Sequence, residues 1–477
     1  MIDTEALRSK ILDLAIRGKL TEQLPEDGSA EDLYAKIQEE KARLVKEGKI
    51  KKEIDLPEIT EDEIPYEIPK KWKWCKLGNV FEIVMGQSPN GESINSQEGM
   101  EFHQGKIYFG SKCLNKSGKK TIEATKIAKE NSVLLCVRAP VGIVNITDRE
   151  ICIGRGLCAL TVVTGVELEY LYYYLKTRRK SFELKGTGST FSAISVDDVK
   201  AHAFPFPPLP EQKRIIDKVN DILERIDEIE KLQSQYSTDV EVLKSKLIDA
   251  GIRGKLTEQL PEDGDAEDLY NQIQDEKARL IKEGKIKKEK PLPEMPKGKI
   301  PFNIPKNWKW VRLGDISAKI SSGNTPAGGK NSDAYVENGY CFFREQNIYD
   351  DGIREEGLVY ITEELLNTRE NSTVLPMDIL LNITGGSIGR CALVPDNFTK
   401  GSINQHILII RMIDPRLRFY VHKCICSPYV QKYIKGNVVG DKDGFSGGRC
   451  KNMLIPLPPI EEQERIVEIL EKFLLQF

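Results

Sequence analysis

The sequence predicts an α+β protein that carries an internal repeat: two mixed α/β globular domains joined by long antiparallel coiled-coil helices, with pseudo-two-fold symmetry. Three observations lead to this prediction. Two nearly identical segments lie 236 residues apart, a heptad pattern runs through the middle of the chain, and a β-rich stretch follows each copy of the repeated segment. Self-similarity at a fixed spacing indicates a repeated structural module.

The repeat is strongest in residues 16–53 and 252–289, where 33 of 38 positions are identical. It continues into IPKKWKWCKLGNV (68–80) and IPKNWKWVRLGDI (304–316) and then fades. It returns with FPFPPLPEQKRI in the first half and IPLPPIEEQERI in the second, now offset by 251 residues. Each half is therefore a nearly copied scaffold around a diverged insert, and the inserts must carry whatever differs between the halves.

These boundaries divide the chain into five regions. They are an N-terminal helical region (1–67), a first globular domain (68–208), a central region with a long spacer helix (209–303), a second globular domain (304–457) and a C-terminal helix (458–477).

Composition limits the class of protein. The 477 residues are 40% hydrophobic, enough for sizeable cores, and the net charge of -3 argues against a uniformly basic nucleic-acid binder. Positive charge is nevertheless concentrated locally, because residues 41–53 hold six Lys or Arg against two Glu. No apolar run approaches the ~18 residues that a membrane span needs, so no membrane association is expected.

The cysteines carry no metal pattern. Ten occur without a Cys-X-X-Cys pair, and the sequence shows no signal peptide, which together point to the cytoplasm. Cys424 and Cys426 form a Cys-X-Cys with His422 nearby. We interpret these as ordinary thiols and expect no metal site.

A heptad pattern begins near Glu211 and holds for about 33 residues, which is typical of a coiled coil. A helix of about 40 residues would be roughly 60 Å long and would need a partner for its apolar stripe. The positions expected to form the coiled coil and to dock subunits are Ile215, Val219, Ile222, Ile226, Ile229, Val240, Leu243, Ile466, Leu470 and Phe473.

The two chain ends supply the second copy of this helix. By the repeat, Phe477 corresponds to Ile226 and Met1 to Ser237, so ten residues of the copy have no counterpart. We expect both ends to pack beside the central helix and to close the molecule into a ring.

A shorter helix is expected in each scaffold copy, over residues 29–47 and 265–283. Ser29 and Asp265 resemble N-caps. The Pro-rich stretches that follow, 56–69 and 292–305, are expected to be loops or arms.

The inserts contain β-rich runs at 132–146 and 378–394. Each reads as an apolar strand, a polar turn with Gly and a second strand, a pattern typical of a hairpin. Arg138 and Arg390 lie in or beside these turns, where side chains can reach a ligand.

At this point the chain resembles a known family. The strings IPKKWKWCKLG and IPKNWKWVRLG, the openings MGQSP (85–89) and SSGNTP (321–326), and the exits FPFPPLPEQKRI and IPLPPIEEQERI are similar to the specificity subunit of type I restriction–modification enzymes. The resemblance covers essentially the whole chain, and the order of the strings, repeated twice around a heptad helix, is highly specific.

The resemblance implies a function. In that family each insert is a target recognition domain, the helices separate the domains, and the double-stranded DNA site is bipartite and asymmetric. The implied partners are two modification (methyltransferase) subunits and restriction (ATP-dependent translocase and nuclease) subunits. No cofactor is expected in this chain; S-adenosylmethionine, ATP and Mg are expected on the partners.

Phosphate contacts supply affinity and base-edge contacts supply specificity, for which Arg, Lys, Asn and Gln suit the major groove. The candidate DNA-binding residues of the first domain are Gln87, Ser88, Arg138, Arg155, Thr190 and Ser192. Those of the second domain are Ser322, Asn324, Thr325, Arg344, Gln346, Asn347, Ser387, Arg390, Arg449 and Lys451.

Aromatic and histidine residues of the scaffold are expected to be structural. Trp72, Trp74, Trp308 and Trp310 belong to the repeated strings and are expected in the core rather than stacked on bases. No nucleophile accompanies His103 or His406.

Two other classes are less consistent with the sequence. An enzyme, either methyltransferase or nuclease, would need motifs that are missing here: no Asn- or Asp-Pro-Pro-aromatic string occurs, and residues 323–330 only approach a P-loop. A coiled-coil scaffold that binds only proteins would leave the two diverged inserts unexplained. We therefore expect no catalytic residues in this chain.

Overall fold

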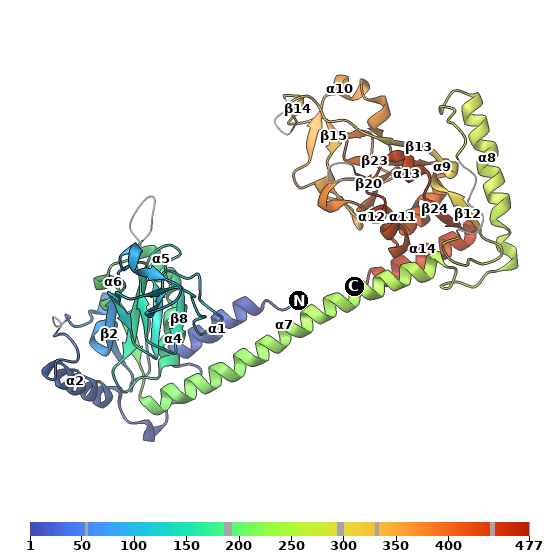
Figure 1. The fold of residues 1–477 in the computed structure, drawn as a ribbon. Helices are drawn as coiled ribbons and strands as arrows, with labels where there is room; N and C mark the ends of the chain where they lie inside the picture. Colours follow the sequence, from blue (N-terminus) through green and yellow to red (C-terminus); the bar gives the residue numbers. More distant parts are fainter. Residues whose placement is uncertain (53–55, 186–192, 293–299, 330–332, 439–443, 477) are drawn as a thin grey trace. The chain divides into compact units, whose positions relative to one another are not determined.

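The computed structural model describes all residues except 53–55, 186–192, 293–299, 330–332, 439–443 and 477. It divides into two compact units, residues 1–234 and 235–477, each with its own sheets and helices (Figure 1). The boundary falls inside the helix α7, Leu209–Ile252, which is 44 residues long. The α+β fold and the internal repeat that the sequence predicts are confirmed.

The first unit places a four-stranded antiparallel sheet, ordered β2-β10-β7-β8, beside a five-stranded mixed sheet, ordered β3-β5-β4-β9-β6. A separate pair, β1 and β11, joins the start of the insert to its end. Its strands are β1 Lys73–Lys76, β2 Phe81–Met85, β3 Ile94–Asn95, β4 Met100–His103, β5 Lys120–Thr121, β6 Ile127–Ala128, β7 Ser132–Cys136, β8 Val144–Thr147, β9 Ile151–Ile153, β10 Leu157–Val162 and β11 Ala203–Phe206. Its helices besides α7 are α1 Thr4–Ile16, α2 Ala30–Lys46, α3 Leu77–Val80, α4 Leu168–Thr177, α5 Arg179–Lys185 and α6 Val196–Lys200.

The second unit repeats this plan with sheets ordered β13-β23-β20-β21 and β14-β18-β15-β22-β19, the pair β12–β24 and an added hairpin β16–β17. Its strands are β12 Lys309–Arg312, β13 Ser317–Ser322, β14 Tyr335–Val336, β15 Tyr340–Phe343, β16 Ile348–Tyr349, β17 Gly352–Ile353, β18 Val359–Ile361, β19 Thr373–Val374, β20 Ile379–Asn382, β21 Cys391–Leu393, β22 Gly401–Ile403, β23 Ile407–Met412 and β24 Leu454–Leu457. Its helices are α8 Ala266–Lys282, α9 Leu313–Ile316, α10 Glu363–Asn367, α11 Arg418–Cys426, α12 Pro428–Gly436, α13 Gly447–Lys451 and α14 Ile460–Leu474.

The hairpins expected at 132–146 and 378–394 are confirmed as β7–β8 and β20–β21. All five residues of β7 and all four of β20 are buried. Such fully buried strands suit the centre of a sheet that is covered on both faces.

One helix packs on the core of each unit: α4 in the first unit and α11 in the second. Tyr170 on α4 and Tyr420 on α11 are each almost fully buried and meet a scaffold tryptophan edge-on, with ring centroids 6.4 Å apart. Trp72, Trp308 and Trp310 are buried and Trp74 is half-buried, so the tryptophans pack in the core as predicted.

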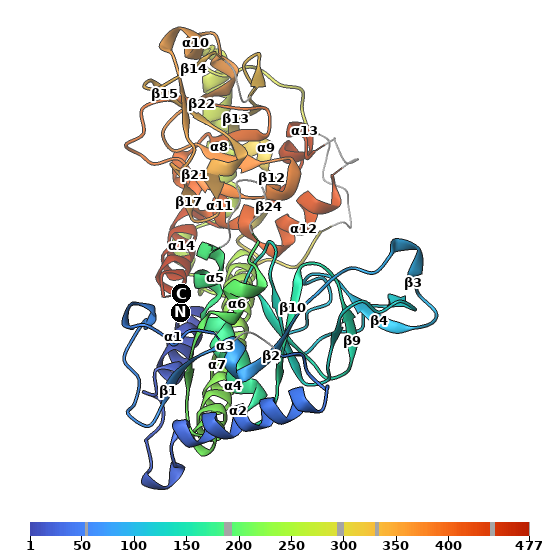
Figure 2. The ribbon, with the colours of Figure 1, turned by 90° about the vertical axis from the view of Figure 1, so that its left-hand side faces the viewer.

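The long helices pair within each unit. In the first, α1 lies along α7: Arg8 forms ion pairs with Asp227 and Glu230 (Figures 1 and 2). In the second, α14 packs on the last turns of α7, where Gly251 leaves room for Ile466. Each chain end therefore packs beside the central helix, as the split copy predicts; closure into a ring remains a prediction.

Most of the apolar heptad positions are buried by contacts within this chain. Ile215, Val219, Ile226, Ile466 and Leu470 are buried, and all but Ile226 belong to the core clusters of their units. Val240 is buried as well, and Ile222 and Ile229 are half-buried. By contrast, Leu243 and Phe473 are exposed, at 41% and 43%. Of the predicted docking positions, only these last two present much apolar surface.

The shorter helix pair is also confirmed. Ser29 and Asp265 cap α2 and α8 by accepting the backbone N–H of Glu31 and Glu267, at 3.0 and 2.8 Å. Such caps satisfy N–H groups that the first helical turn leaves unpaired. Residues 56–69 form a loop with one 3-10 turn, Glu61–Glu63. Among the described helices, none is both long and apolar enough to cross a membrane.

Candidate nucleic-acid interface

In the first unit, four of the predicted DNA-binding residues gather around the loop 154–156, which joins β9 to β10. The chain leaves β2 at Gly86, whose backbone lies so close to the Gly154 carbonyl that a Cβ atom would collide with it. The N–H of Gln87 then donates to Ile153 O, at 3.0 Å. This close approach explains the glycine and fixes where Gln87 and Ser88 begin.

Local hydrogen bonds hold the backbone of this group in place. Ser88 Oγ accepts the N–H of Arg155 at 3.2 Å, and the Thr125 hydroxyl donates to the carbonyl of Gln87. The side chains of Gln87 and Arg155 are exposed. The backbone is thus fixed while these two side chains are left available to a ligand.

Arg138 joins the group from the other side. It follows β7, where Val137 donates its N–H to Gly156 O at 2.9 Å, and it is exposed. We call Gln87, Ser88, Arg138 and Arg155 the first loop cluster. Within the described part of the chain, neither arginine of this cluster forms an ion pair. The remaining predicted residues of this domain, Thr190 and Ser192, lie outside the described residues.

The second unit repeats this arrangement around the loop 404–406, which joins β22 to β23. Gly323 approaches the Ile403 carbonyl as Gly86 approaches Gly154, so a Cβ atom would again collide. Thr325 donates its hydroxyl hydrogen bond to Gln405 Oε1. Ser322 and Asn324 are exposed beside it.

His406 lies at the centre of this second group. Its Nδ1 is 2.6 Å from the Thr384 hydroxyl, and its Nε2 is 3.1 Å from Gln405 Nε2. We call Ser322, Asn324, Thr325, Gln405 and His406 the second loop cluster.

Glu345 holds the loop 404–406 in place through hydrogen bonds. Its carboxylate accepts a hydrogen bond from Asn404 Nδ2 at 2.8 Å, and its carbonyl accepts one from Asn382 Nδ2 at 2.8 Å. Burial acts to raise the pKa of Glu345, but the hydrogen bond from Asn404 and the neighbouring charges lower it overall. The carboxylate therefore stays ionised and keeps the Asn404 amide in place.

Three predicted residues of the second domain, Asn324, Arg344 and Gln346, form hydrogen bonds within the domain. Asn324 accepts two from Arg369, at its carbonyl and at its Oδ1, at 2.5 and 2.7 Å. Arg344 donates to Gly357 O at 2.5 Å, as does Gln346 at 3.4 Å. Their remaining donors can still reach a ligand.

Asn347 is different, because it is fully buried. Its amide donates to the carbonyls of Arg354 and Glu356, and its Oδ1 accepts the N–H of Arg344 at 3.0 Å. With these bonds made inside the domain, the structure leaves Asn347 nothing to offer a base.

Four further predicted residues are not members of the second loop cluster. Arg390 stacks on Tyr349 with 4.5 Å to the ring centroid and lines a hollow beside α7, α11 and α14. Arg449 donates to Asn437 O at 2.5 Å, and Lys451 pairs with Glu289 at 2.5 Å. Ser387 accepts a hydrogen bond from Asn382 at 3.1 Å.

Sequence reasoning did not select Gln405 or Thr384, and it assigned His406 a structural role. Gln405 and His406 could have been found by continuing the self-alignment into the inserts, because Ile153 and Ile403 follow the same strand plan at an offset of 250. The loop that reads Gly-Arg-Gly in the first half then reads Asn-Gln-His in the second. Thr384 carried no such signal, since only its contact with His406 reveals it.

Most of the remaining histidines and cysteines lie in the interior, whereas Cys113 is exposed and Cys341 and Cys426 are half-buried. His103 is buried and lies 2.8 Å from Glu101, and His422 Nε2 lies 2.9 Å from the carbonyl of Cys391. Cys424 is buried in the core. Across the described ranges, no three His, Cys, Asp or Glu side chains are placed to hold a metal ion.

The sequence was compared with known protein families and with curated proteins. The family described as type I restriction modification DNA specificity domain matches twice, at residues 69–236 and 305–477. Two relatives from Escherichia coli, the specificity subunits of the type I restriction enzymes EcoAI and EcoEI, are 27% and 26% identical to this chain. Each alignment covers 98% of this chain and 88% of the relative. A putative MjaX specificity subunit of Methanocaldococcus jannaschii is 36% identical over 40% of this chain and 44% of its own length.

Solved structures share the fold. A chain from a structure concerning complex assembly and conformational transition of the type I R-M system aligns with a TM-score of 0.60 at 19% identity, covering 86% of this chain and 92% of that one. The HsdS subunit from Thermoanaerobacter tengcongensis aligns with a TM-score of 0.51 at 19% identity, covering 87% and 92%. The family match spans more than half of the sequence, so this chain belongs to the type I restriction modification DNA specificity domain family. It carries two copies of that domain, one in each half.

Proposed function

We propose that this chain is the DNA sequence-recognition subunit of a type I restriction–modification complex, with each globular domain reading one half of an asymmetric bipartite site. One observation carries the proposal. The specificity domain occurs twice on a nearly identical scaffold, and the two copies differ in one loop, 154–156 against 404–406, whose exposed middle residue is Arg155 in the first and Gln405 in the second. Two different readers on one frame suit two different half-sites.

The chemistry of the two loop clusters fits base contacts of different kinds. Arg155 and Arg138 can each donate two parallel hydrogen bonds, which suits the O6 and N7 acceptors of guanine. Gln405 can donate and accept at once, which suits adenine. We therefore expect the first half-site to be richer in guanine contacts than the second.

Partner subunits complete the activity in this proposal. Two modification subunits, together with restriction subunits, would supply methyl transfer, translocation and cleavage, and would bind S-adenosylmethionine, ATP and Mg. This chain would perform no chemistry itself. Apolar surface for docking is available on α7 and α14, where Tyr236, Leu243 and Phe473 are 58%, 41% and 43% exposed.

We also propose that the complex works in the cytoplasm. All ten cysteines are free thiols, and seven of them are buried: Cys75, Cys136, Cys152, Cys158, Cys391, Cys424 and Cys450. Unpaired cysteines of this kind are usual in reducing compartments.

The test is methylome sequencing of cells that carry this gene with its partner genes, in the wild type and in the variants Arg155→Ala and Gln405→Ala. We expect a methylated motif in two parts, and we expect each variant to relax preference in one part only, by about 1–3 kcal/mol of base discrimination. Conversely, a motif in one continuous block, or a change in both parts from one substitution, would contradict the proposal.

A further inference from the structure

A groove with a basic lining lies in the first unit between the end of α2 and the edge strand β2. Its volume is about 760 Å3, and its charged lining includes Lys49, Lys51, Lys126 and Arg155. Glu82 is the one acidic residue among the residues that line it, and this carboxylate is already paired with Lys129 at 2.6 Å. The groove therefore carries an excess of positive charge.

These cations are largely uncompensated. Lys49 pairs with Glu47 at 2.8 Å in an exposed contact. In the portion of the chain that the structure describes, Lys51, Lys126 and Arg155 form no ion pair. Lys51 is exposed and Lys126 is half-buried. Lysines without ion-pair partners are groups that phosphate oxygens can engage, because no existing pair must first be broken.

The groove is fixed in position by packing of α2. Lys41 Nζ donates to the carbonyls of Gly78 and Asn79 at 2.8 and 3.3 Å, and Gln38 donates to Asn79 O at 2.9 Å. The helix then ends at Gly48, whose φ of 70° lets the N–H of Lys49 return to Leu44 O at 2.9 Å. This glycine termination directs the lysines after it along β2.

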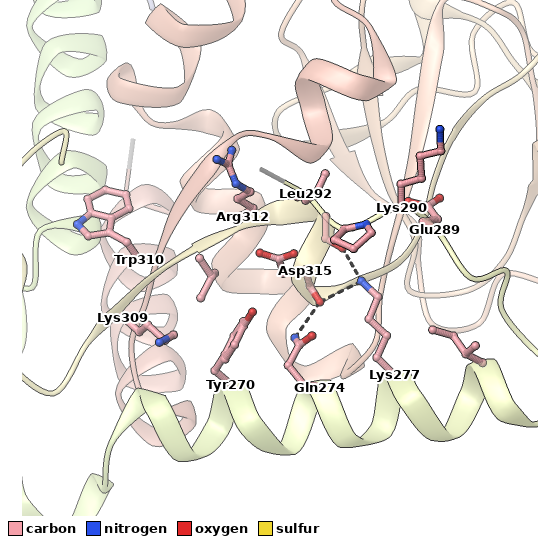
Figure 3. Close-up of a pocket in the computed structure, with 14 residues that line it drawn as sticks. Tyr270, Gln274, Lys277, Glu289, Lys290, Leu292, Lys309, Trp310, Arg312 and Asp315 are labelled. Atoms are coloured by element: carbon pink, nitrogen blue, oxygen red, sulfur yellow. Dashed lines mark hydrogen bonds between the residues drawn. The ribbon is translucent and has the colours of Figure 1, made fainter. Parts of the chain in front are cut away.

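The second unit anchors its arm in the same way. Lys277 Nζ donates to Gly314 O at 2.7 Å and Gln274 donates to Asp315 O at 3.1 Å, in the pocket beneath α8 (Figure 3). Lys285 pairs with Glu283 at 2.8 Å, as Lys49 pairs with Glu47.

The repeat also places lysines after α8, because Lys287 is the counterpart of Lys51. The charge beside the edge strand β13 is mixed: burial of Lys319 and the positive charge of Arg411 lower the pKa of Lys319, whereas Asp378 and Glu370 act to raise it. The second arm is therefore inferred from the repeated sequence and from the shared anchoring of α2 and α8.

The basic groove also contains part of the reading site. Gln87 and Arg155, both members of the first loop cluster, line it together with the lysines. A DNA strand whose bases meet Gln87 and Arg155 would therefore have its neighbouring phosphates within reach of Lys51 and Lys126.

We infer that α2 and α8, with the lysines that follow them, are arms that hold the DNA phosphate backbone beside each recognition domain, independently of sequence. This inference rests on the proposed function and extends it, because it assigns a DNA contact to the repeated scaffold rather than to the diverged inserts. It also explains how a chain with a net charge of -3 can bind a polyanion, since its positive charge is concentrated beside the reading loops.

The test compares the double variant Lys51→Glu/Lys126→Glu with Lys10→Glu/Lys231→Glu in the full chain. The control makes the same change in net charge at exposed lysines of the first unit that do not line the groove. Affinity is measured by fluorescence anisotropy on two duplexes, one with the motif from methylome sequencing and one with its bases shuffled, from about 50 to about 200 mM salt.

We expect the groove variant to lose affinity for both duplexes by the same factor, roughly tenfold, and to lower the slope of log affinity against log salt by about 1–2. The ratio between the duplexes should stay as in the wild type. A second variant, Lys285→Glu/Lys287→Glu, should behave alike through the other arm. Circular dichroism of each variant should match the wild type.

Two results would overturn the inference. Groove variants that bind both duplexes as the control does would exclude a phosphate contact, and variants that weaken only the motif duplex would show that the arms read sequence. The proposed function has a separate readout: a wild-type chain that binds both duplexes equally would contradict base reading, whatever the lysine variants do.

Discussion

The two halves of this molecule share many of their scaffold contacts and differ in the loops that those contacts support. Trp72 donates to Glu211 at 2.8 Å in the first half, and Trp308 donates to Glu462 at 2.8 Å in the second. The loops 154–156 and 404–406, in contrast, have no side-chain chemistry in common. A frame can thus be copied unchanged while the part that it presents is free to diverge.

The difference shows which part of this fold can change so that the protein binds a different ligand. Sheet order is the same in both units, and the central strands are buried on both faces. Substitutions there would disturb packing. The middle residues of the loops 154–156 and 404–406, Arg155 and Gln405, are exposed, so their side chains can change with little cost to the core.

The largest expected effect comes from removing the scaffold tryptophans. Trp72→Ala and Trp308→Ala should each lower the free energy of unfolding by about 3–5 kcal/mol, because each leaves a cavity and removes one hydrogen-bond donor from a buried carboxylate. Urea unfolding followed by circular dichroism measures this. Because the environments match, the two losses should agree closely; a large loss in one half alone would break the comparison.

The next effect concerns a buried carboxylate in each half. Arg214 pairs with Asp27 at 2.6 Å and Arg465 pairs with Asp263 at 2.5 Å, and both carboxylates are buried. Arg214→Ala and Arg465→Ala should each cost about 1–3 kcal/mol, since an acceptor is left unsatisfied.

This pair also predicts a pH dependence. The hydrogen bond from Arg214 lowers the pKa of Asp27 below its ordinary value of 3.8, and Arg465 does the same for Asp263. A lowered carboxyl pKa stabilises the fold above the unfolded value, and this stabilisation is lost as pH falls below about 3.8. Unfolding between pH 6 and 3 should therefore be less pH-dependent in the alanine variants than in the wild type; equal slopes would contradict the pairing.

A smaller effect should separate the halves. In the first, Arg149 and the N–H of Ser117 donate to Glu101 and lower its pKa to about 2. Cys341 takes the equivalent position on β15 in the second half and offers no such carboxylate. Glu101→Gln should cost about 1–2 kcal/mol at neutral pH after solvent screening.

That cost has a defined pH range. Because the folded pKa of Glu101 is lowered, its contribution is complete above the unfolded value near 4.5 and is lost as pH falls toward 2. Acid unfolding of wild type and Glu101→Gln should therefore converge near pH 2. A gap that persists there would mean that packing, rather than charge, accounts for the loss.

The smallest effect is expected on the arms. Arg43 bridges Glu40 and Glu47 on α2, and Arg279 bridges Glu276 and Glu283 on α8, all at exposed positions. Exposed pairs of this kind contribute little. Arg43→Ala and Arg279→Ala should leave urea midpoints unchanged within error, and a measurable shift in either would show that these networks stabilise the arms.

Periodicity and repetition were sufficient to predict the frame. Self-alignment predicted the two copies, and the heptad pattern predicted α7 and the packing of both chain ends on it. Apolar runs separated by a polar turn with Gly predicted the hairpins. The split helix was recoverable because its two pieces keep the register of the intact copy. These features depend on local spacing, which one sequence records fully.

Individual contacts were less predictable, for physical reasons. Arg390 was expected at the reading loop because it follows a turn, yet stacking on Tyr349 of the added hairpin directs it elsewhere. Asn347 was chosen for its chemistry, but burial consumes its hydrogen bonds. Gln405 and His406 come together with Thr384 only through long-range strand pairing, which a local pattern does not encode.

The most direct test of the account is to make the two halves equal. A chain in which the first insert, residues 69–206, is replaced by the second, residues 305–457, keeps both scaffolds and carries one reader twice. Methylome sequencing of cells with this chain and its partner genes should give a motif whose two parts have the same base content, both matching the second half-site of the wild type. A motif that still contains the wild-type first half-site would contradict the account, because the scaffold, rather than the insert, would then be reading DNA.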